Sequence, residues 1–490
     1  MPDPPRHRHE PDDAPTPRRV AVIGGGLAGL VAAHRLAGRP PGSPKIEVSL
    51  FEASDRFGGI LRSVRDGEWL VEHGPDMLQT KPAAVSLIER LGLEGQAIGT
   101  ETRYRGALVL KDGKPVPVPS GFALMSPNRP RSLATTPLLR PAGRARAIAE
   151  AFVPPGPPDA DPSVADFARR RFGVEAFERL VEPLVAGIYT GDAERISLRA
   201  TLPRFLDDER RHGSLTRAAT SRRTSGSRGG GIGPAAADAD TGARYGEFLS
   251  FPDGIAELTD RLAERLDAAD RVFLRPSTPV TAVTPAEDDW RVAIADGPEE
   301  RFDDVVLAVS AAVAARLCVT CGPLADRLAA LRHASSAVVI TRHRLADVGD
   351  PLAAFGLVVP TAENRSAIAI SFTSRKFPGR APEGHVLLRT FLGGVKKPSL
   401  LERTDEELIE MTRRELAEIL DAKPPDHAEV VRWPGAMPQY EVGHLERIAE
   451  LDRSVAESPG LHLCGLSYRG VGIADVIAEA EKTAETVAER

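Results

Sequence analysis

Cysteine is scarce in this chain, which limits how the fold can be held together. Only three of the 490 residues are cysteine, too few for a disulfide framework. A reducing cytoplasmic compartment is therefore the simplest expectation. No apolar run reaches the roughly eighteen residues of a membrane-spanning helix. Residues 1–17 lack the apolar centre of a secretion signal, and their Pro, Asp and His content predicts a disordered tail.

A strong excess of one sign of charge is also missing. The formal net charge is −6, which gives the chain no general attraction for nucleic acid. Hydrophobic residues make up 42% of the sequence and charged residues 27%, values typical of a soluble globular protein. A length of 490 residues leaves room for two or three domains around a large core.

The clearest motif follows the apolar run that ends at Ile23. It reads Gly24-x-Gly26-x-x-Gly29 and opens an Ala-rich helical pattern. In a dinucleotide-binding turn the first glycine permits the bend, the second admits the pyrophosphate, and the third lets helix and strand pack closely. The helix N-terminus then directs free N–H groups at the phosphates. We therefore expect these residues to bind a dinucleotide: Gly24, Gly25, Gly26, Leu27, Ala28 and Gly29.

Three further features follow this motif in order. A second apolar strand pattern ends in Glu52, 52 − 29 = 23 positions after Gly29, about where an acid binds a ribose hydroxyl. Gly58 and Gly59 permit another close backbone approach, and Arg56 could lie near the pyrophosphate. The strand pattern Glu68–Glu72 then leads into His73-Gly74-Pro75-Asp76, a rigid turn that can hold backbone atoms against a ligand.

Together these features resemble the FAD-dependent amine oxidase superfamily, which includes porphyrinogen oxidases, monoamine oxidases and carotenoid desaturases. The resemblance implies FAD as the resident cofactor. It also implies a two-domain α/β (α+β) fold, with a Rossmann-like FAD-binding domain, a sheet-based substrate domain and a helical insertion. Further FAD contacts implied by these motifs are Ala53, Gly59, Ile60, Gly74, Pro75, Asp76 and Met77.

Three later segments narrow the resemblance to the porphyrinogen oxidases: Gly187–Thr201, Trp433–His444 and Ser467–Asp475. In that family the first glycine of the first segment lies beside the macrocycle, so its carbonyl can accept a pyrrole N–H. This assigns Gly187 to the substrate, although a helix-terminating glycine is the alternative. The family also carries a basic residue just after the Gly-Pro turn, facing the substrate. Lys81 is that residue here, and a solvated surface lysine is its alternative.

The resemblance implies more FAD contacts late in the chain. Val280 matches a valine whose backbone contacts the adenine, and Pro-rich geometry would hold Trp433 near the cofactor or, alternatively, in a domain interface. Gly465 ends the last strand, and Val471, Gly472 and Ile473 would present backbone N–H groups to the flavin. The helix N-terminus there favours the negative charge of reduced flavin.

The expected division of the chain gives three discontinuous parts to the FAD-binding domain. These are 18–94, 243–318 and 436–490, with a substrate domain over 319–435. Residues 95–242 form a helical insertion that ends in a flexible loop over 220–242. Helical spacing runs over Ser163–Leu184, and one long helix is predicted over Asp405–Leu420.

Metal-binding and acid–base residues are not expected. Cys318-Val319-Thr320-Cys321 is a lone C-x-x-C without a second ligand pair, so it predicts two buried or loop thiols or, alternatively, a redox pair. His212 has no partner acid that would make it a general base. Cys464 lies near the closing motif, but covalently linked flavins of the superfamily use a different motif.

The implied activity is oxidation of coproporphyrinogen III to coproporphyrin III in heme biosynthesis. Six electrons are lost, hydrides pass from bridging carbons to flavin N5, and dioxygen is the acceptor. Protoporphyrinogen IX is the alternative substrate. Its enzymes often sit on membranes, and the arginine-rich segment Leu133–Phe152 could lie on anionic lipid. Amine oxidase, carotenoid desaturase and a flavin-binding protein without turnover are more distant alternatives, and a homodimer stays open.

Overall fold

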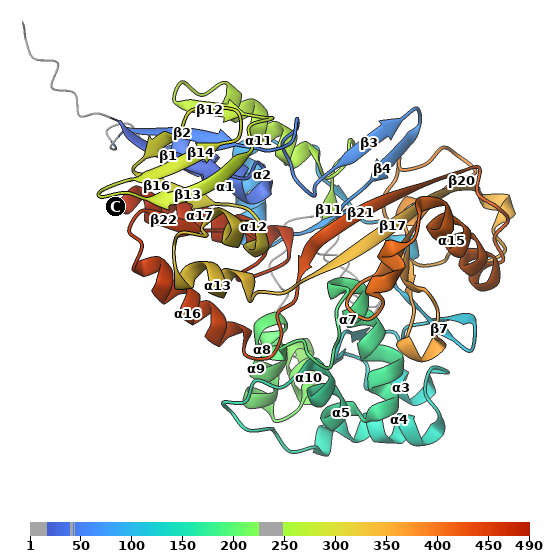
Figure 1. Ribbon diagram of the computed structural model, residues 1–490. Helices are drawn as coiled ribbons and strands as arrows, with labels where there is room; N and C mark the ends of the chain where they lie inside the picture. Colours follow the sequence, from blue (N-terminus) through green and yellow to red (C-terminus); the bar gives the residue numbers. More distant parts are fainter. Residues whose placement is uncertain (1–16, 40–42, 44, 225–247) are drawn as a thin grey trace, which may run out of the picture.

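A parallel sheet of five strands forms one part of the fold (Figure 1). The computed structural model describes residues 17–39, 43, 45–224 and 248–490. Every neighbouring pair of strands in the order β12-β2-β1-β16-β22 is parallel. The strands come from distant parts of the chain: β1 (Arg18–Ile23), β2 (Ile46–Phe51), β12 (Val272–Arg275), β16 (Asp304–Leu307) and β22 (Leu461–Leu463).

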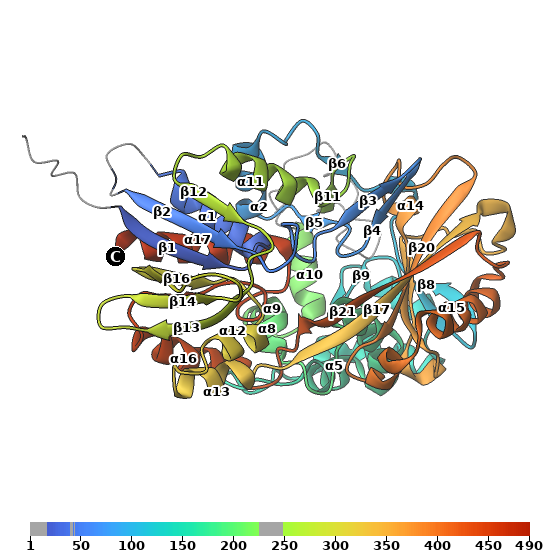
Figure 2. The same ribbon diagram turned by 45° about the horizontal axis from the view of Figure 1, so that its top comes forward.

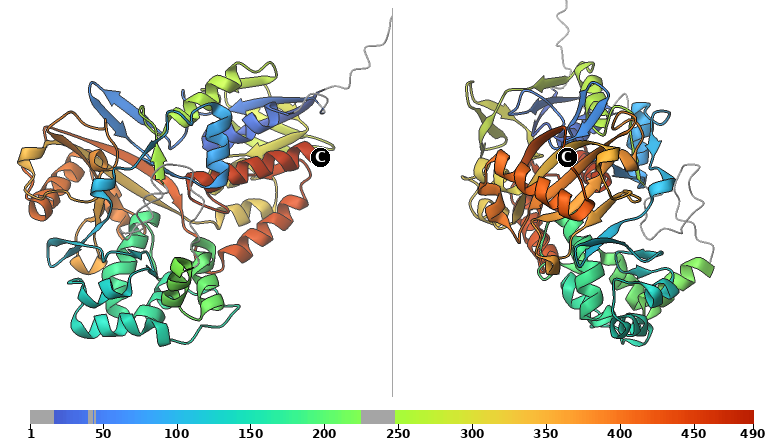
Figure 3. Two further views of the ribbon diagram at one scale, coloured as in Figure 1. Left: turned by 180° about the vertical axis from the view of Figure 1, so that it is seen from behind. Right: turned by 90° about the vertical axis from the view of Figure 1, so that its right-hand side faces the viewer.

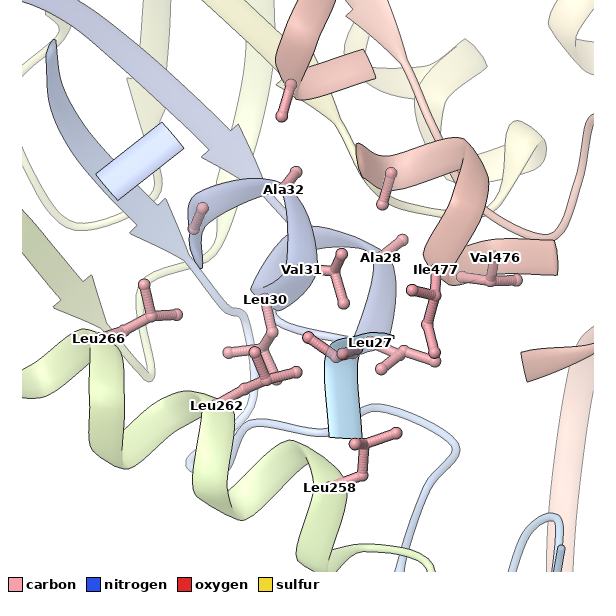
Figure 4. Close-up of a cluster of buried hydrophobic side chains, with 14 of the residues drawn as sticks. Leu27, Ala28, Leu30, Val31, Ala32, Leu258, Leu262, Leu266, Val476 and Ile477 are labelled. Atoms are coloured by element: carbon pink, nitrogen blue, oxygen red, sulfur yellow. The ribbon is translucent and has the colours of Figure 1, made fainter. Parts of the chain in front are cut away.

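Helices cover one face of this sheet. Val20 and Val22 of β1 point into that core. In Figure 4, Leu27 and Leu30 of the first helix lie close to Leu262 of one neighbouring helix and Ile477 of another. A strand covered on both faces needs an almost continuous apolar run, which β1 has from Val20 to Ile23. The helices on this face are α1 (Leu27–Ala37), α2 (Pro82–Leu91), α11 (Glu257–Asp267) and α17 (Ile473–Glu489).

The opposite face carries a small antiparallel sheet and three helices. Ala21 and Ile23 pack there in one apolar cluster with Trp290, Phe302 and Ile448. The elements on this face are β13 (Val280–Pro285), β14 (Trp290–Ile294), β15 (Glu300–Phe302), α12 (Ala311–Leu317), α13 (Pro323–Ala329) and α16 (His444–Ala456).

A mixed sheet of seven strands forms the second part, in the order β21-β17-β20-β19-β18-β7-β8. Residues of β17 alternate between its faces: Val339 packs with α15, whereas Val338 packs with Val71 of β4 (Trp69–Glu72). The predicted helix Asp405–Leu420 is confirmed as α15. The strands are β7 (Leu108–Lys111), β8 (Lys114–Pro117), β17 (His333–Arg344), β18 (Gly356–Val358), β19 (Ala367–Phe372), β20 (His385–Gly393) and β21 (His427–Pro438).

A helical region lies below both sheets (Figures 1 and 3). The helical pattern over Ser163–Leu184 is not one helix, because Gly173 adopts φ +89° and ends its first part. The described helices here are α3 (Pro130–Thr135), α4 (Pro141–Ile148), α5 (Val164–Phe172), α6 (Val174–Ala176), the π-helical η3 (Phe177–Val181), α7 (Glu182–Tyr189), α8 (Leu198–Thr201), α9 (Pro203–His212) and α10 (Leu215–Thr224).

Short strands connect the larger parts. Figure 2 shows β3 (Ser63–Asp66) and β4 between the parallel sheet and the mixed sheet. The remaining short strands are β5 (Leu78–Gln79), β6 (Ile98–Gly99), β9 (Phe122–Ala123), β10 (Ser126–Pro127) and β11 (Phe248–Ser250).

Two predicted irregular segments fall largely outside the described residues. The tail predicted over 1–17 is described only at Pro17, and the loop predicted over 220–242 only up to Thr224. That loop prediction is wrong for residues 220–224, which end α10, a helix whose buried Ala218 and Ala219 give it a packed face. Within the described ranges, no helix is both long and apolar enough to cross a bilayer.

Candidate active site

Two glycine turns meet at the carboxyl end of β1. Gly24 has φ +109°, and a Cβ at Gly29 would lie 1.9 Å from the carbonyl oxygen of Gly24. The Gly58 N–H donates to the carbonyl of Gly25 at 2.8 Å, and a Cβ at Gly59 would lie 3.1 Å from the Cα of Gly26. Side chains at these positions would clash, so the two turns present bare backbone to a ligand.

Two helix N-termini beside these turns have no side-chain cap. Gly26 is the N-cap of α1 and Gly472 is the N-cap of α17, and neither helix receives a capping side-chain hydrogen bond. The two helices pack against each other, and a Cβ at Gly465 would lie 3.8 Å from the Cβ of Ala28. Uncapped helix N-termini favour an anion. The residues present therefore fit the pyrophosphate of FAD at α1 and a negatively charged reduced flavin at α17.

Glu52 stands at the end of β2, where the ribose of a dinucleotide would lie. One carboxylate oxygen accepts the Gly25 N–H at 2.8 Å, and the other accepts the Ser54 N–H at 2.8 Å. The Thr278 N–H donates to the Glu52 carbonyl at 2.8 Å, which brings the chain leading to Val280 alongside. The structure thus gathers two predicted cofactor contacts, Glu52 and Val280, from segments far apart in the sequence.

Arg56 points inward, into its own turn. Its guanidinium donates to the carbonyl of Phe57 at 3.0 Å and also to that of Gly59. Burial lowers the pKa of Arg56, and the neighbouring Arg62 lowers it further. Arg56 therefore braces the second glycine turn, and the pyrophosphate contact predicted for it stays a prediction.

The Gly-Pro turn is held by side chains of the mixed sheet. Trp433 Nε1–H donates to the carbonyl of His73 at 2.9 Å, and Arg389 of β20 donates to the carbonyl of Gly74. A Cβ at Gly74 would lie 1.8 Å from the carbonyl oxygen of Ile60, so only glycine fits. The sheet thereby fixes the backbone that Gly74, Pro75 and Met77 are predicted to present to FAD.

Asp76 turns its carboxylate toward Arg389 of the same sheet and Lys376 of the short helix α14 (Thr373–Lys376). The Nζ of Lys376 lies 2.8 Å and an Arg389 nitrogen 3.4 Å from one carboxylate oxygen, and Asp76 is only 6% exposed. Burial alone would raise the pKa of Asp76, but the charges of Lys376 and Arg389 outweigh burial and hold the pKa below its usual value. Because Lys376 and Arg389 pair with the carboxylate, we expect Asp76 to contact FAD through its backbone.

The predicted substrate residues lie on two different helices. Lys81 is the N-cap of α2, and its Nζ pairs with Oδ1 of Asp475, in the first turn of α17, at 2.7 Å. Lys81 thus stands beside the predicted flavin loop. Gly187 does not end its helix, because α7 runs to Tyr189 and Thr190 is the C-cap. Its carbonyl belongs to the last turn, where helix carbonyls lack a helical donor.

Cys318 and Cys321 pack in one apolar cluster, whereas Cys464 packs with Leu27 and Ala28 and directly precedes Gly465. Cys318 is buried and Cys321 half-buried, and a hydrogen bond between the two thiols raises the pKa of Cys318 and lowers that of Cys321. Cys464 is fully buried, which raises its pKa. In the described part of the chain, no three His, Cys, Asp or Glu side chains are grouped to hold a metal ion.

Several side chains that organise the site were missed from the sequence: Lys376, Arg389, Tyr440 and His444. Arg389 is the one charged residue in Val386–Leu392, and a charge in a mainly apolar strand is a usable signal of a buried partner. Tyr440 and His444 lie inside the Trp433–His444 segment, but nothing in the sequence shows what they contact.

Replacing Asp76 with Asn should destabilise the protein by about 3–5 kcal/mol at neutral pH, because two buried cations lose their carboxylate. The folded pKa of Asp76 is below its unfolded value, so its contribution is complete above that unfolded value and is lost as pH falls. The free energies of unfolding of wild type and D76N, measured in urea, should therefore converge below about pH 4.

The matched control is Asp66→Asn, which removes an exposed partner of Arg342. D66N should change the free energy of unfolding little at any pH. If D76N is as stable as the wild type at pH 7, the ion pairs of Asp76 with Lys376 and Arg389 do not stabilise the fold as expected.

Comparison with known proteins agrees with this geometry. The pattern of the family described as flavin containing amine oxidoreductase matches residues 27–488. A coproporphyrinogen III oxidase of Bacillus subtilis is 30% identical over 468 residues, covering 95% of this chain and 96% of its own. One from Propionibacterium freudenreichii is 32% identical, covering 97% and 92%, and a chloroplastic protoporphyrinogen oxidase of Nicotiana tabacum is 29% identical, covering 95% and 84%.

A crystal structure from Exiguobacterium, provisionally named a protoporphyrinogen oxidase, superposes with a TM-score of 0.83 at 27% identity. The superposition covers 97% of this chain and 99% of the other. The expected α/β architecture is thereby confirmed. The chain therefore belongs to the flavin containing amine oxidoreductase family and is an oxidoreductase with FAD as its cofactor.

Proposed function

We propose that this oxidoreductase converts coproporphyrinogen III to coproporphyrin III, with dioxygen as the electron acceptor, in porphyrin biosynthesis. The observation that carries the proposal is similarity along nearly the whole chain to three bacterial proteins named coproporphyrinogen III oxidase. They are 30–32% identical and match 95–97% of this chain. A cytoplasmic location belongs to the same proposal.

In this proposal the residues of the chain bind and orient, and FAD, when bound, supplies the hydride-accepting chemistry. Gly26 and Glu52 would hold the pyrophosphate and ribose. The N-terminus of α17 would stabilise negative charge that develops at the flavin. Lys81 would meet a carboxylate of the substrate, and the last-turn carbonyl of Gly187 would accept a pyrrole N–H.

Lys81 is well suited to exchange partners. Its present partner, Asp475, is on the neighbouring helix, and the side chains of Lys81 and Asp475 are 45% and 36% exposed. An ion pair this open contributes little free energy, so a substrate carboxylate could replace Asp475 at small cost. Coproporphyrinogen III has four propionates, so a cation beside the predicted flavin loop would have a carboxylate to bind.

Protoporphyrinogen IX is the second candidate substrate. Relatives named protoporphyrinogen oxidase match 94–96% of this chain at 27–29% identity. Membrane contact would fall on the segment Leu133–Phe152, where Phe152 is 84% exposed and Ile148 is 39% exposed. A homodimer stays a prediction. The molecular mass of the protein in solution would test it.

Purified holoenzyme offered the two porphyrinogens separately should show at least a ten-fold higher kcat/KM for coproporphyrinogen III. The measurement is the rise of porphyrin fluorescence, with oxygen consumption followed in parallel. A preference for protoporphyrinogen IX would replace the proposed substrate by the second candidate. Turnover of neither compound would reject the function itself.

Lys81→Ala should raise the apparent KM for coproporphyrinogen about five-fold, because a partly exposed ion pair contributes about 1 kcal/mol. The flavin content should stay unchanged, since Lys81 is not expected to bind FAD. The measurements are initial rates at varied substrate concentration and flavin absorbance per protein.

The control for this prediction is Lys423→Ala. Lys423 pairs with Asp347 at 2.6 Å on the surface, so K423A removes a comparable ion pair away from the flavin loop. K423A should keep the wild-type KM. Equal KM values for K81A and wild type would remove Lys81 from substrate recognition.

A further inference from the structure

We propose that Tyr440 is a positioning residue that holds the loop Leu466–Gly470 so that the backbone N–H groups of Val471–Ile473 meet the flavin. The inference rests on FAD as the cofactor and is independent of which porphyrinogen is oxidised. It concerns a side chain to which the sequence alone gives no role.

The Tyr440 hydroxyl bridges both ends of this loop. It donates a hydrogen bond to the carbonyl of Leu466 at 2.6 Å and accepts one from the N–H of Gly470 at 2.8 Å. Tyr440 is only 3% exposed, and burial raises its pKa far above the usual value. The phenol therefore stays protonated, and both hydrogen bonds exist together.

His444 holds the loop between those two points. Its ring stacks on the ring of Tyr440, with centroids 4.0 Å apart and planes 15° apart. Its Nε2 lies 2.7 Å from the carbonyl of Tyr468, so Nε2 carries the proton and donates. Burial lowers the pKa of His444, which keeps the ring neutral.

Two further contacts hold Ser467. The hydroxyl of Ser467 accepts the N–H of Ala311, at the start of α12, at 3.1 Å. Nε2 of His333, at the start of β17, lies 2.9 Å from the same hydroxyl. Four residues of the loop are thus each held by a side chain or backbone group from another element.

The loop contains only a turn over residues 466–468, in which the Tyr468 N–H donates to the carbonyl of Gly465 at 3.4 Å, so its shape depends mainly on contacts with other elements. It lies between β22 and α17, and neither strand nor helix hydrogen bonds define its shape. It leads directly into Gly472, the N-cap of α17. A Cβ at Gly470 would lie 2.4 Å from the Cβ of Asp475, so a side chain at this position would displace Asp475 or the backbone of the loop. A shift of the Gly470 backbone would displace the N–H groups of Val471–Ile473, which follow it.

The segment that carries Tyr440 also reaches the substrate helix. Gln439 donates from its side-chain nitrogen to the carbonyl of Tyr189 at 3.1 Å. Tyr189 is the last residue of α7, two positions after Gly187. Neighbouring residues at the end of β21 therefore fix the flavin loop and the end of α7 relative to one another.

The test compares Tyr440→Phe with Tyr468→Phe. Tyr468 lies in the same loop and is 1% exposed, but its hydroxyl finds no hydrogen-bond partner among the described residues. The two variants lose the same atom from equally buried rings, and only Y440F breaks the bridge. Apoprotein is titrated with FAD and followed by flavin fluorescence, and the reconstituted protein is studied by visible spectroscopy and redox titration.

Y440F should bind FAD about ten-fold more weakly than wild type, because a buried carbonyl and N–H lose their partner. Its flavin absorption bands should shift, and its midpoint potential should fall, because negative charge on reduced flavin is less well stabilised. Y468F should stay within two-fold of the wild-type dissociation constant, with an unchanged spectrum and potential.

A purely structural role predicts a different result. In that case Y440F would lower the melting temperature of the apoprotein but leave the FAD dissociation constant, spectrum and potential at wild-type values, which would overturn the proposal.

If Y440F fails to fold, His444→Phe keeps the stacked ring and removes only the contact to Tyr468. H444F should weaken FAD binding in the same direction, and wild-type binding by H444F would equally overturn it. Every measurement is made without porphyrinogen. An error in the proposed substrate therefore cannot change the FAD binding, spectrum or potential of Y440F or H444F.

Discussion

The rest of the structure depends on one constraint: backbone that is predicted to contact FAD is held in place by side chains from the mixed sheet and from a short helix beside it. Trp433 and Arg389 hold the carbonyls of His73 and Gly74, and Asp76 pairs with Lys376 and Arg389 beneath the turn. These contacts are buried, so each polar group depends on its partner for the hydrogen bonds that water would otherwise supply. The cofactor turn and the sheet therefore cannot move independently without leaving charges unpaired.

The same arrangement recurs at the second backbone segment that is predicted to contact FAD. Tyr440 and His444 follow β21 closely and hold the loop before α17, as Trp433 within β21 holds the Gly-Pro turn. One edge strand thus reaches two separate backbone segments predicted to line the flavin. Hydrogen bonds to backbone carbonyls and N–H groups suit this purpose, because they fix position without placing further charge beside the cofactor.

The sequence predicts features that depend on residues close together in the chain. It does not predict contacts between residues that are far apart in the chain. Gly24, Gly26 and Gly29 were identified because steric limits on a turn act over a few residues, and α15 because its apolar period is continuous. Arg389 meets Gly74 across 315 residues, and no pattern along the chain encodes such a pairing. Similarly, the helical spacing across Gly173 was real, but periodicity does not reveal a glycine that adopts a positive φ.

This division between local and distant determinants follows from the chemistry. An oxidoreductase whose cofactor accepts the hydride needs no acid–base pair with a recognisable spacing, so the protein's contribution is mainly geometric. A displacement of about 1 Å in the presented N–H groups can cost two orders of magnitude in rate. The geometry of such a site therefore depends on buried residues that hold backbone in place, such as Arg389 and Tyr440, and only the fold shows what those residues contact.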